Sequence, residues 1–214
     1  MSREYDFAER LAFSRGIAET THPDTIIKLI PGCVDVQRTS KTEDRRGIDF
    51  KAILRRGAEL NIDIKSREKG CSKFWQPYRF GQGIEPELAL EKYSVAPPSA
   101  IENPIVEEPK TGWTLDESKE TDYTLHVFDP SDTIEVFLLP FQLLRIAFRK
   151  HIDSWYANFK HARQFTHSSF GSWESECIFV PGWCVIEAVS AEMRPKTPAS
   201  PVESLGSLSG RAQR

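Results

Sequence analysis

Three charged residues, Asp49, Asp63 and Lys65, have the types and the spacing that metal-assisted hydrolysis requires. Asp63 and Lys65 are two positions apart, so their side chains lie on one face of an extended strand. Two carboxylates held side by side repel each other, and a divalent cation such as Mg²⁺ removes that repulsion because it prefers carboxylate oxygens as ligands. A lysine beside them can stabilise negative charge that develops during a reaction. These residues predict a metal site, provided that the fold brings Asp49 next to Asp63.

A β-hairpin is the element that would bring the two aspartates together. Apolar and polar residues alternate on both sides of a short break at residues 55–57, which is the pattern of two strands joined by a tight turn. A three-residue loop places Gly57 last, where a left-handed backbone conformation is needed. That loop sets Asp49 directly opposite Asp63, with Lys65 further along the same face. The same register pairs each apolar residue with another: Leu54 with Ala58, Ala52 with Leu60, Phe50 with Ile62, and Ile48 with Ile64.

The order Asp49, then Asp63-Ile64-Lys65, resembles the signature of the PD-(D/E)XK nuclease superfamily, with Ile48 in place of the proline of that motif. The resemblance implies a restriction-endonuclease-like core and a nuclease that hydrolyses phosphodiester bonds in DNA with Mg²⁺ or Mn²⁺. It implies that Asp49 and Asp63 bind the metal and that the backbone carbonyl of Ile64 adds a ligand. Lys65 would hold or polarise the attacking water.

Three glutamates are secondary candidates. In the nuclease family a glutamate from the first helix often joins the metal site, which implies a role for Glu9. Glu59 lies on the same predicted strand face as Asp63, and Glu91 lies on the next predicted strand. Each of them is equally explained as a solvated surface residue.

Two other functions fit the same residues. The chain can be a catalytically inactive nuclease-like fold that acts as a nucleic-acid-binding or assembly protein, or an enzyme that hydrolyses a small phosphoester. The hairpin can also be an ordinary strand pair with one solvated polar face. A binding protein should bind nucleic acid without cutting it, and Asp49→Ala should leave that binding intact.

Hydrophobic periodicity predicts an α/β (α+β) domain, a mixed central β-sheet flanked by helices. We expect a helix over residues 5–19, a turn-rich connection over 20–33, a strand at 34–37, a charged loop at 40–46, the hairpin, strands at 88–95, 122–128 and 133–139, a helix from Pro140, a strand at 176–181 and a helix at 183–193. Residues 1–193 would form one nuclease-like domain. Residues 194–214 are rich in Pro and Ser and predict a disordered tail.

Composition favours a globular protein with a localised charge imbalance. The 214 residues are 39% hydrophobic and 28% charged, and no apolar run is long enough for a membrane span, so we expect a cytoplasmic protein. The net charge is −3, but residues 1–84 hold 16 Lys/Arg against 12 Asp/Glu. A phosphate backbone would therefore meet the N-terminal half, and DNA is the expected partner. Oligomeric state is left open by the sequence.

Overall fold

The computed structural model describes residues 4–6, 22–67, 76–77, 84–97, 108–128, 135–168 and 171–194. Its helices are α2 (His22–Leu29), α3 (Lys41–Arg45), α4 (Phe141–Asn158) and α5 (Gly182–Met193). Its strands are β1 (Glu4–Asp6), β2 (Cys33–Arg38), β3 (Phe50–Leu54), β4 (Glu59–Arg67), β5 (Gln76–Pro77), β6 (Ile84–Glu85), β7 (Glu87–Val95), β8 (Lys110–Thr111), β9 (Tyr123–Phe128), β10 (Glu135–Pro140), β11 (His161–Ser168) and β12 (Gly171–Pro181). No helix in these ranges combines the length and the apolar character that a bilayer crossing requires.

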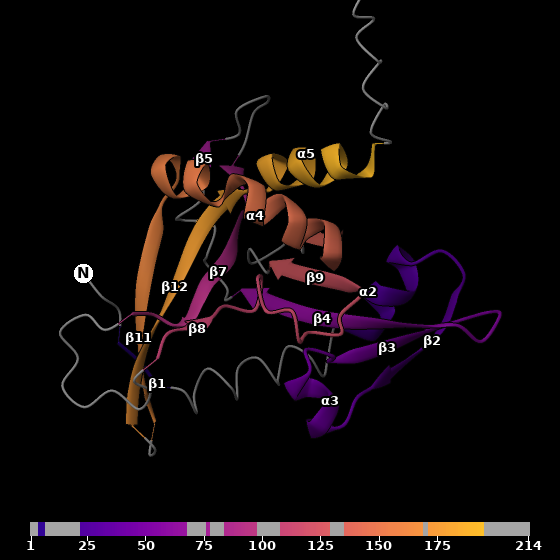
Figure 1. Cartoon of the computed structure of the whole chain (residues 1–214). Coiled ribbons are helices and arrows are strands. Elements are labelled where there is room, and N and C mark those ends of the chain that lie inside the picture. The colour runs from indigo at the N-terminus through magenta and orange to yellow at the C-terminus, as the bar shows by residue number, and fades with distance from the viewer. Residues whose placement is uncertain are drawn as a thin grey trace, which may run out of the picture.

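The strands form two five-stranded sheets and a two-stranded one. One sheet has the order β10-β9-β4-β3-β2, in which β4 and β9 are parallel and the other neighbours are antiparallel. The other has the order β1-β11-β12-β7-β8, with β1 and β11 parallel. Figure 1 shows the two sheets side by side, with α4 and α5 above them. The predicted mixture of helices and mixed sheet is confirmed, but the strands are divided between two sheets and do not form a single central one.

The hairpin of β3 and β4 has the predicted register over its paired residues. Phe50 faces Ile62, Ala52 faces Leu60, and the tight turn is closed by a hydrogen bond from the Leu54 N–H to the Ala58 carbonyl at 2.8 Å. Gly57 has a φ of 79°, the left-handed conformation that the three-residue loop requires. Apolar pairing and turn geometry together select this register, since a slip by one residue would expose the apolar face.

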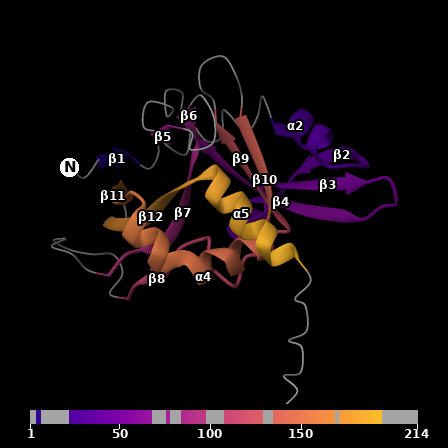
Figure 2. The same ribbon diagram turned by 90° about the horizontal axis from the view of Figure 1, so that it is seen from above.

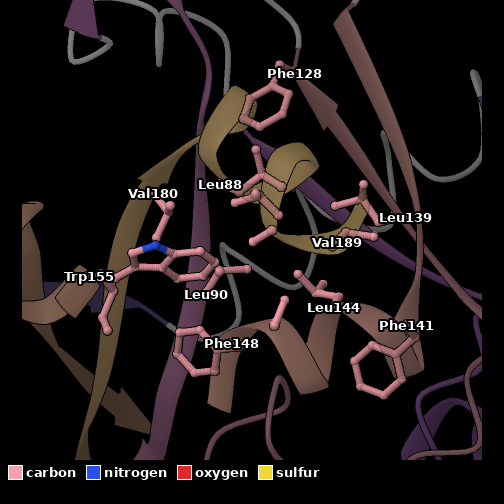
Figure 3. Close-up of a cluster of buried hydrophobic side chains, with 14 residues drawn as sticks. Leu88, Leu90, Phe128, Leu139, Phe141, Leu144, Phe148, Trp155, Val180 and Val189 are labelled. Carbon is pink, nitrogen blue, oxygen red and sulfur yellow. The ribbon is translucent and has the colours of Figure 1, made fainter. Parts of the chain in front are cut away.

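Two apolar clusters hold the sheets in place. The smaller cluster covers one face of the hairpin sheet. There Ile26 of α2 and Ile30, which directly follows α2, pack on Phe50, Ile62 and Leu125. The larger lies between α4, α5 and strands of both sheets, and Figure 3 shows its side chains pointing toward one another. Figure 2 shows α5 lying between the β7–β12 side and the β9–β10 side of the molecule, with α4 packed beside α5. The larger cluster therefore joins the two sheets into one core.

Two segments that were predicted to be irregular are helical. Residues 22–29 form α2, because Pro23 lies in the first turn, where its missing N–H has no partner to lose, and Asp24 complements the helix dipole. Residues 41–45 form α3, which begins at Ser40 with a capping box: the Glu43 N–H donates to the Ser40 hydroxyl, and the Ser40 N–H donates to the Glu43 carboxylate. The sequence Ser-x-x-Glu carried this signal.

The capping box gives a first prediction. Ser40→Ala removes the hydroxyl that accepts the Glu43 N–H, so α3 should lose about 1 kcal/mol of stability. Chemical denaturation of the variant measures this loss. Ser40→Thr keeps a capping hydroxyl, which accepts the Glu43 N–H and donates to the Glu43 carboxylate, and should restore the wild-type midpoint; equal destabilisation by both substitutions would contradict the capping role.

Other predicted elements have mixed outcomes. The helix predicted over residues 5–19 is wrong at its start, because Tyr5 belongs to β1, and its remainder lies outside the described residues. The strand β11 was not predicted at all, and β12 begins earlier than expected. The predicted strands that became β2, β7, β9 and β10 are confirmed, as are α4 after Pro140 and α5. Apart from Arg194, the predicted tail lies outside the described residues.

Candidate functional site

Strand β4 places Asp63 and Lys65 on one face of the hairpin sheet. Its parallel neighbour β9 sets Thr124 beside Asp63 and His126 beside Lys65. Residues paired in a sheet share a face, so four polar side chains of two adjacent strands form one patch. The opposite face of both strands carries Ile62, Leu125 and other residues of the smaller apolar cluster. Alternation along β4 and β9 thus separates the polar patch from this apolar face.

Asp49 reaches the patch from just before β3. Its backbone N–H donates to the carbonyl of Ile62 at 2.9 Å, although Ile62 is already the partner of Phe50. Two residues therefore lie against one, as in a β-bulge, which re-aims the side chain of the extra residue. The Asp49 carboxylate accepts the backbone N–H of Ile64 at 2.6 Å. The ladder ends at Phe50, so the predicted backbone pairs of Asp49 with Asp63 and of Ile48 with Ile64 are not formed.

The side chains of the three predicted residues nevertheless meet. Lys65 Nζ lies 2.9 Å from Oδ1 and 2.8 Å from Oδ2 of Asp63, so the ammonium contacts both carboxylate oxygens. The Asp63 side chain is only 6% exposed, whereas that of Lys65 is 32% exposed. Asp49 joins them through its hydrogen bond from the N–H of Ile64, the residue between Asp63 and Lys65, and the charges of both residues act on its carboxyl group. Asp49, Asp63 and Lys65 therefore form one cluster that opens to solvent on the lysine side.

Burial and charge perturb the titration of this cluster. Desolvation, followed by the negative charge of Asp63, raises the pKa of Asp49 to about 7, although Lys65 and the Ile64 N–H act in the opposite direction. For Lys65, burial disfavours the ammonium, but the Asp63 and Asp49 carboxylates outweigh it and raise the pKa. Lys65 is thus held in its charged form, and the carboxylate of Asp49 takes up a proton near neutral pH. Such perturbed groups are typical of functional sites.

Side-chain hydroxyls fix the backbone that carries Asp49. Thr39 Oγ1 donates to the carbonyl of Ile48, and the Thr39 N–H donates to the carbonyl of Asp49 at 3.1 Å. From the other side, Thr121 Oγ1 donates to the carbonyl of Gly47. Thr121 lies two residues before β9, so this hydrogen bond connects the segment before Asp49 to the chain that enters the strand next to β4. The position of Asp49 is therefore set by contacts on both sides of its loop.

Two residues of the site were not among the sequence candidates. His126 is 2% exposed, its Nε2 has no hydrogen-bond partner among the residues that the structure describes, and burial, then the charges of Lys65 and Arg67, lowers its pKa to about 3. Trp113 lies with its ring centroid 4.7 Å from Lys65 Nζ and 6.0 Å from the His126 ring. A neutral histidine and an indole thus border the lysine. The pairing of β4 with β9 and the path of the loop before β9 create both contacts, and no local sequence pattern encodes them.

The secondary candidates have different outcomes. Glu9 lies outside the described residues. Glu59 lies 3.6 Å from Lys51 Nζ near the turn of the hairpin, and it is not part of the aspartate cluster. The Glu91 carboxylate accepts a hydrogen bond from the backbone N–H of Trp113 at 2.9 Å. Its negative charge also contributes to the raised pKa of Lys65. Ile64 lies in the cluster through its N–H.

Asp49 and Asp63 are the candidate ligands for a divalent cation. In the described part of the chain, no group of three or more His, Cys, Asp or Glu side chains is arranged to hold a metal ion. Asp49 and Asp63 are neighbouring carboxyl groups, and burial, followed by the negative charge of Asp63, raises the pKa of Asp49. Mg²⁺ is commonly held by one or two protein carboxylates while waters and substrate phosphates complete its octahedron. Two partly buried aspartates therefore fit Mg²⁺, and they do not form a complete protein cage.

The basic residues near the hairpin are partly neutralised. Arg46 forms an ion pair with Glu120, and Lys51 lies 2.9 Å from Glu43. The turn residues Arg55 and Arg56 are exposed. The positive balance of the N-terminal half therefore does not become a continuous basic surface over the described residues of the hairpin.

Comparison with known proteins supplies no relative: no family model, curated protein or solved structure matches the chain.

Proposed function

We propose that the protein is a metal-dependent nuclease that hydrolyses phosphodiester bonds in DNA. The observation that carries the proposal is the cluster of Asp49, Asp63 and Lys65, in which a charged lysine contacts an aspartate that is itself beside a second aspartate. Asp63 and Lys65 come from β4 and Asp49 from the segment just before β3, and two carboxylates with a cationic side chain are groups that metal-assisted phosphoryl chemistry uses. Their order in the chain is that of the PD-(D/E)XK signature, which supports DNA as the substrate and a restriction-endonuclease-like core as the fold.

Each residue has a separate role in this proposal. Asp49 and Asp63 would hold Mg²⁺ or Mn²⁺, and Ile64 would contribute its backbone carbonyl. Bound there, the cation would supply Lewis acidity for the attacking water and the scissile phosphate. Lys65 presents its ammonium beside the aspartates, where it stabilises the negative charge that develops on the phosphate oxygens. The buried carboxylate Asp63 holds the lysine in place through both oxygens.

The surrounding fold supports such a site. Asp63 lies on β4 and Asp49 immediately before β3, and the parallel strand β9 beside β4 places polar residues on the same face. The helix α4 follows β10 directly, and its large apolar cluster includes Phe128 and Leu139, which lie on the same face of this sheet as Thr124 and His126. A mixed sheet with helices packed on it gives the rigid elements on which catalytic groups are held most accurately.

Cleavage of supercoiled plasmid tests the proposal. We expect the wild-type protein to nick or linearise the plasmid in Mg²⁺ or Mn²⁺ and to lose this activity in excess EDTA. Asp63→Asn keeps the shape of the side chain but removes its charge, so it should be inactive under all metal conditions. DNA binding without cleavage by the wild-type protein would contradict the proposal and favour the inactive nuclease-like binding protein.

A further inference from the structure

The loop that leads to β9 is attached to β7 of the other sheet. The Gly112 N–H donates to the carbonyl of Lys92 at 2.9 Å, and the Glu91 N–H donates to Thr114 Oγ1 at 3.0 Å. The backbone N–H of Trp113 lies between these two bonds and donates to the Glu91 carboxylate. A side chain at Gly112 would overlap the backbone carbonyl of Glu91, so only glycine permits this approach. Residues 112–114 are therefore fixed to β7 at successive positions.

The indole of Trp113 projects from this attachment to the aspartate–lysine cluster. Its ring lies 4.7 Å from Lys65 Nζ, and its other contacts are the His126 ring at 6.0 Å and the Phe141 ring, stacked at 6.1 Å. An ammonium within about 6 Å of an indole centroid is attracted by the negative face of the ring. Lys65 thus has two partners of different kinds, the Asp63 carboxylate and the Trp113 ring.

We propose that Trp113 is a positioning residue that holds the ammonium of Lys65 at the reaction centre. The inference rests on the proposed function and adds to it a residue outside the Asp-x-Lys segment. A lysine side chain has four flexible bonds, and Asp63 alone is an insecure partner if its oxygens also serve a cation. The indole offers a contact that no metal ion competes for. Because Glu91 fixes the Trp113 backbone, β7 of one sheet determines the place of a lysine on β4 of the other.

The test is a double-substitution cycle of Trp113 and Lys65. Trp113→Leu should lower the kcat of plasmid cleavage by about 10- to 30-fold, in keeping with a partly desolvated cation–π contact. Trp113→Phe retains an aromatic face and should remain within about 3-fold of wild type. In the Lys65→Met background, Trp113→Leu should cause no further loss, because its effect acts through the lysine. If Trp113→Leu lowered kcat by the same factor with and without Lys65, the inference would be overturned. A purely structural defect acts in this way, because its free-energy cost adds to that of any other substitution.

A control separates positioning from general destabilisation. Trp155 is 5% exposed in the large apolar cluster and stacks on His151. Trp155→Leu should lower activity, if at all, by the same factor with and without Lys65. Non-additivity for Trp155 equal to that for Trp113 would overturn the assignment, because both would then report on stability alone.

A spectroscopic arm distinguishes failure of this inference from failure of the proposed function. The indole ¹H–¹⁵N resonance of Trp113 is identified as the one lost in Trp113→Phe. It should shift in Lys65→Met and stay in place in Lys51→Met, since Lys51 pairs with Glu43 and Glu59. An unchanged resonance in Lys65→Met would overturn the inference even if the protein cuts DNA. If this resonance shifted in Lys65→Met but the wild-type protein did not cleave DNA, the contact between Trp113 and Lys65 would be supported and the proposed nuclease function would be contradicted. The same arm decides the matter if Trp113→Leu does not fold.

Discussion

Asp49→Ala and Lys65→Ala should both abolish efficient DNA cleavage while having opposite effects on metal affinity. Asp49→Ala removes a hard oxygen ligand, so Mn²⁺ binding should weaken together with cleavage. Lys65→Ala removes a cation that lies within 2.9 Å of both Asp63 oxygens, so Mn²⁺ binding should persist or tighten. Cleavage should fall about 10²- to 10³-fold, as for the loss of one electrostatic stabiliser of a transition state. Calorimetric Mn²⁺ titration beside a plasmid assay measures both properties.

Lys51→Ala is the matched control for the lysine. Lys51 extends from β3 on the same sheet, and its partners are Glu43 and Glu59. Its replacement should leave both Mn²⁺ affinity and cleavage close to wild type. If Lys65→Ala cut DNA at the wild-type rate, Lys65 would be only a charge on a polar strand, and the non-catalytic binding protein would become the better account.

The second large effect concerns stability and pH. Asp49 has an ordinary pKa of 3.8 in the unfolded chain and about 7 in the folded protein, mainly because of burial and the Asp63 charge. Between about pH 4 and pH 7 the folded state binds a proton that the unfolded state has lost, so stability falls as the pH rises through this window. Asp49→Asn mimics the protonated carboxyl and should remove this loss. At pH 8 the variant should be more stable than wild type, by at most about 4 kcal/mol at about 1.4 kcal/mol per pKa unit.

Denaturant unfolding at pH 4, 6 and 8 checks this expectation. The difference between Asp49→Asn and wild type should be small at pH 4, increase up to pH 7 and then level off. Asp153→Asn, on the exposed side of α4, should follow the wild-type profile. A pH-independent difference for Asp49→Asn would contradict the raised pKa. Mn²⁺ at pH 8 should stabilise wild type more than Asp49→Asn, because only the aspartate offers a charged ligand.

Local patterns in the sequence predicted the hairpin and the meeting of its three charged side chains. The period-two alternation and Gly57 define the turn and the register, and both depend on residues within a few positions of each other. The bulge at Asp49 was not predictable in this way. It is accompanied by hydrogen bonds from Thr39, at the end of the neighbouring strand β2, and from Thr121, which comes from a distant part of the chain.

Contacts between distant segments also account for the other differences. Trp113 borders Lys65 only because its loop attaches to β7, and His126 does so only because β9 pairs in parallel with β4. Parallel neighbours are set by tertiary packing, and no turn sequence marks them. The helices α2 and α3 are a different case, because their start signals, Pro23 and Ser-x-x-Glu, are local in the sequence but stand among residues that are also typical of loops. The large apolar cluster required both sheets to be assembled before its members could meet.

The most direct measurement is anomalous X-ray diffraction from crystals of the wild-type protein with Mn²⁺. We expect one anomalous peak within coordination distance of both the Asp49 and Asp63 carboxylates, with Lys65 close by over the Trp113 ring. We also expect this peak to be lost in crystals of Asp49→Ala. Crystals in which Mn²⁺ is absent from this site, while Lys65 remains paired with Asp63, would contradict the metal site and with it the proposed nuclease.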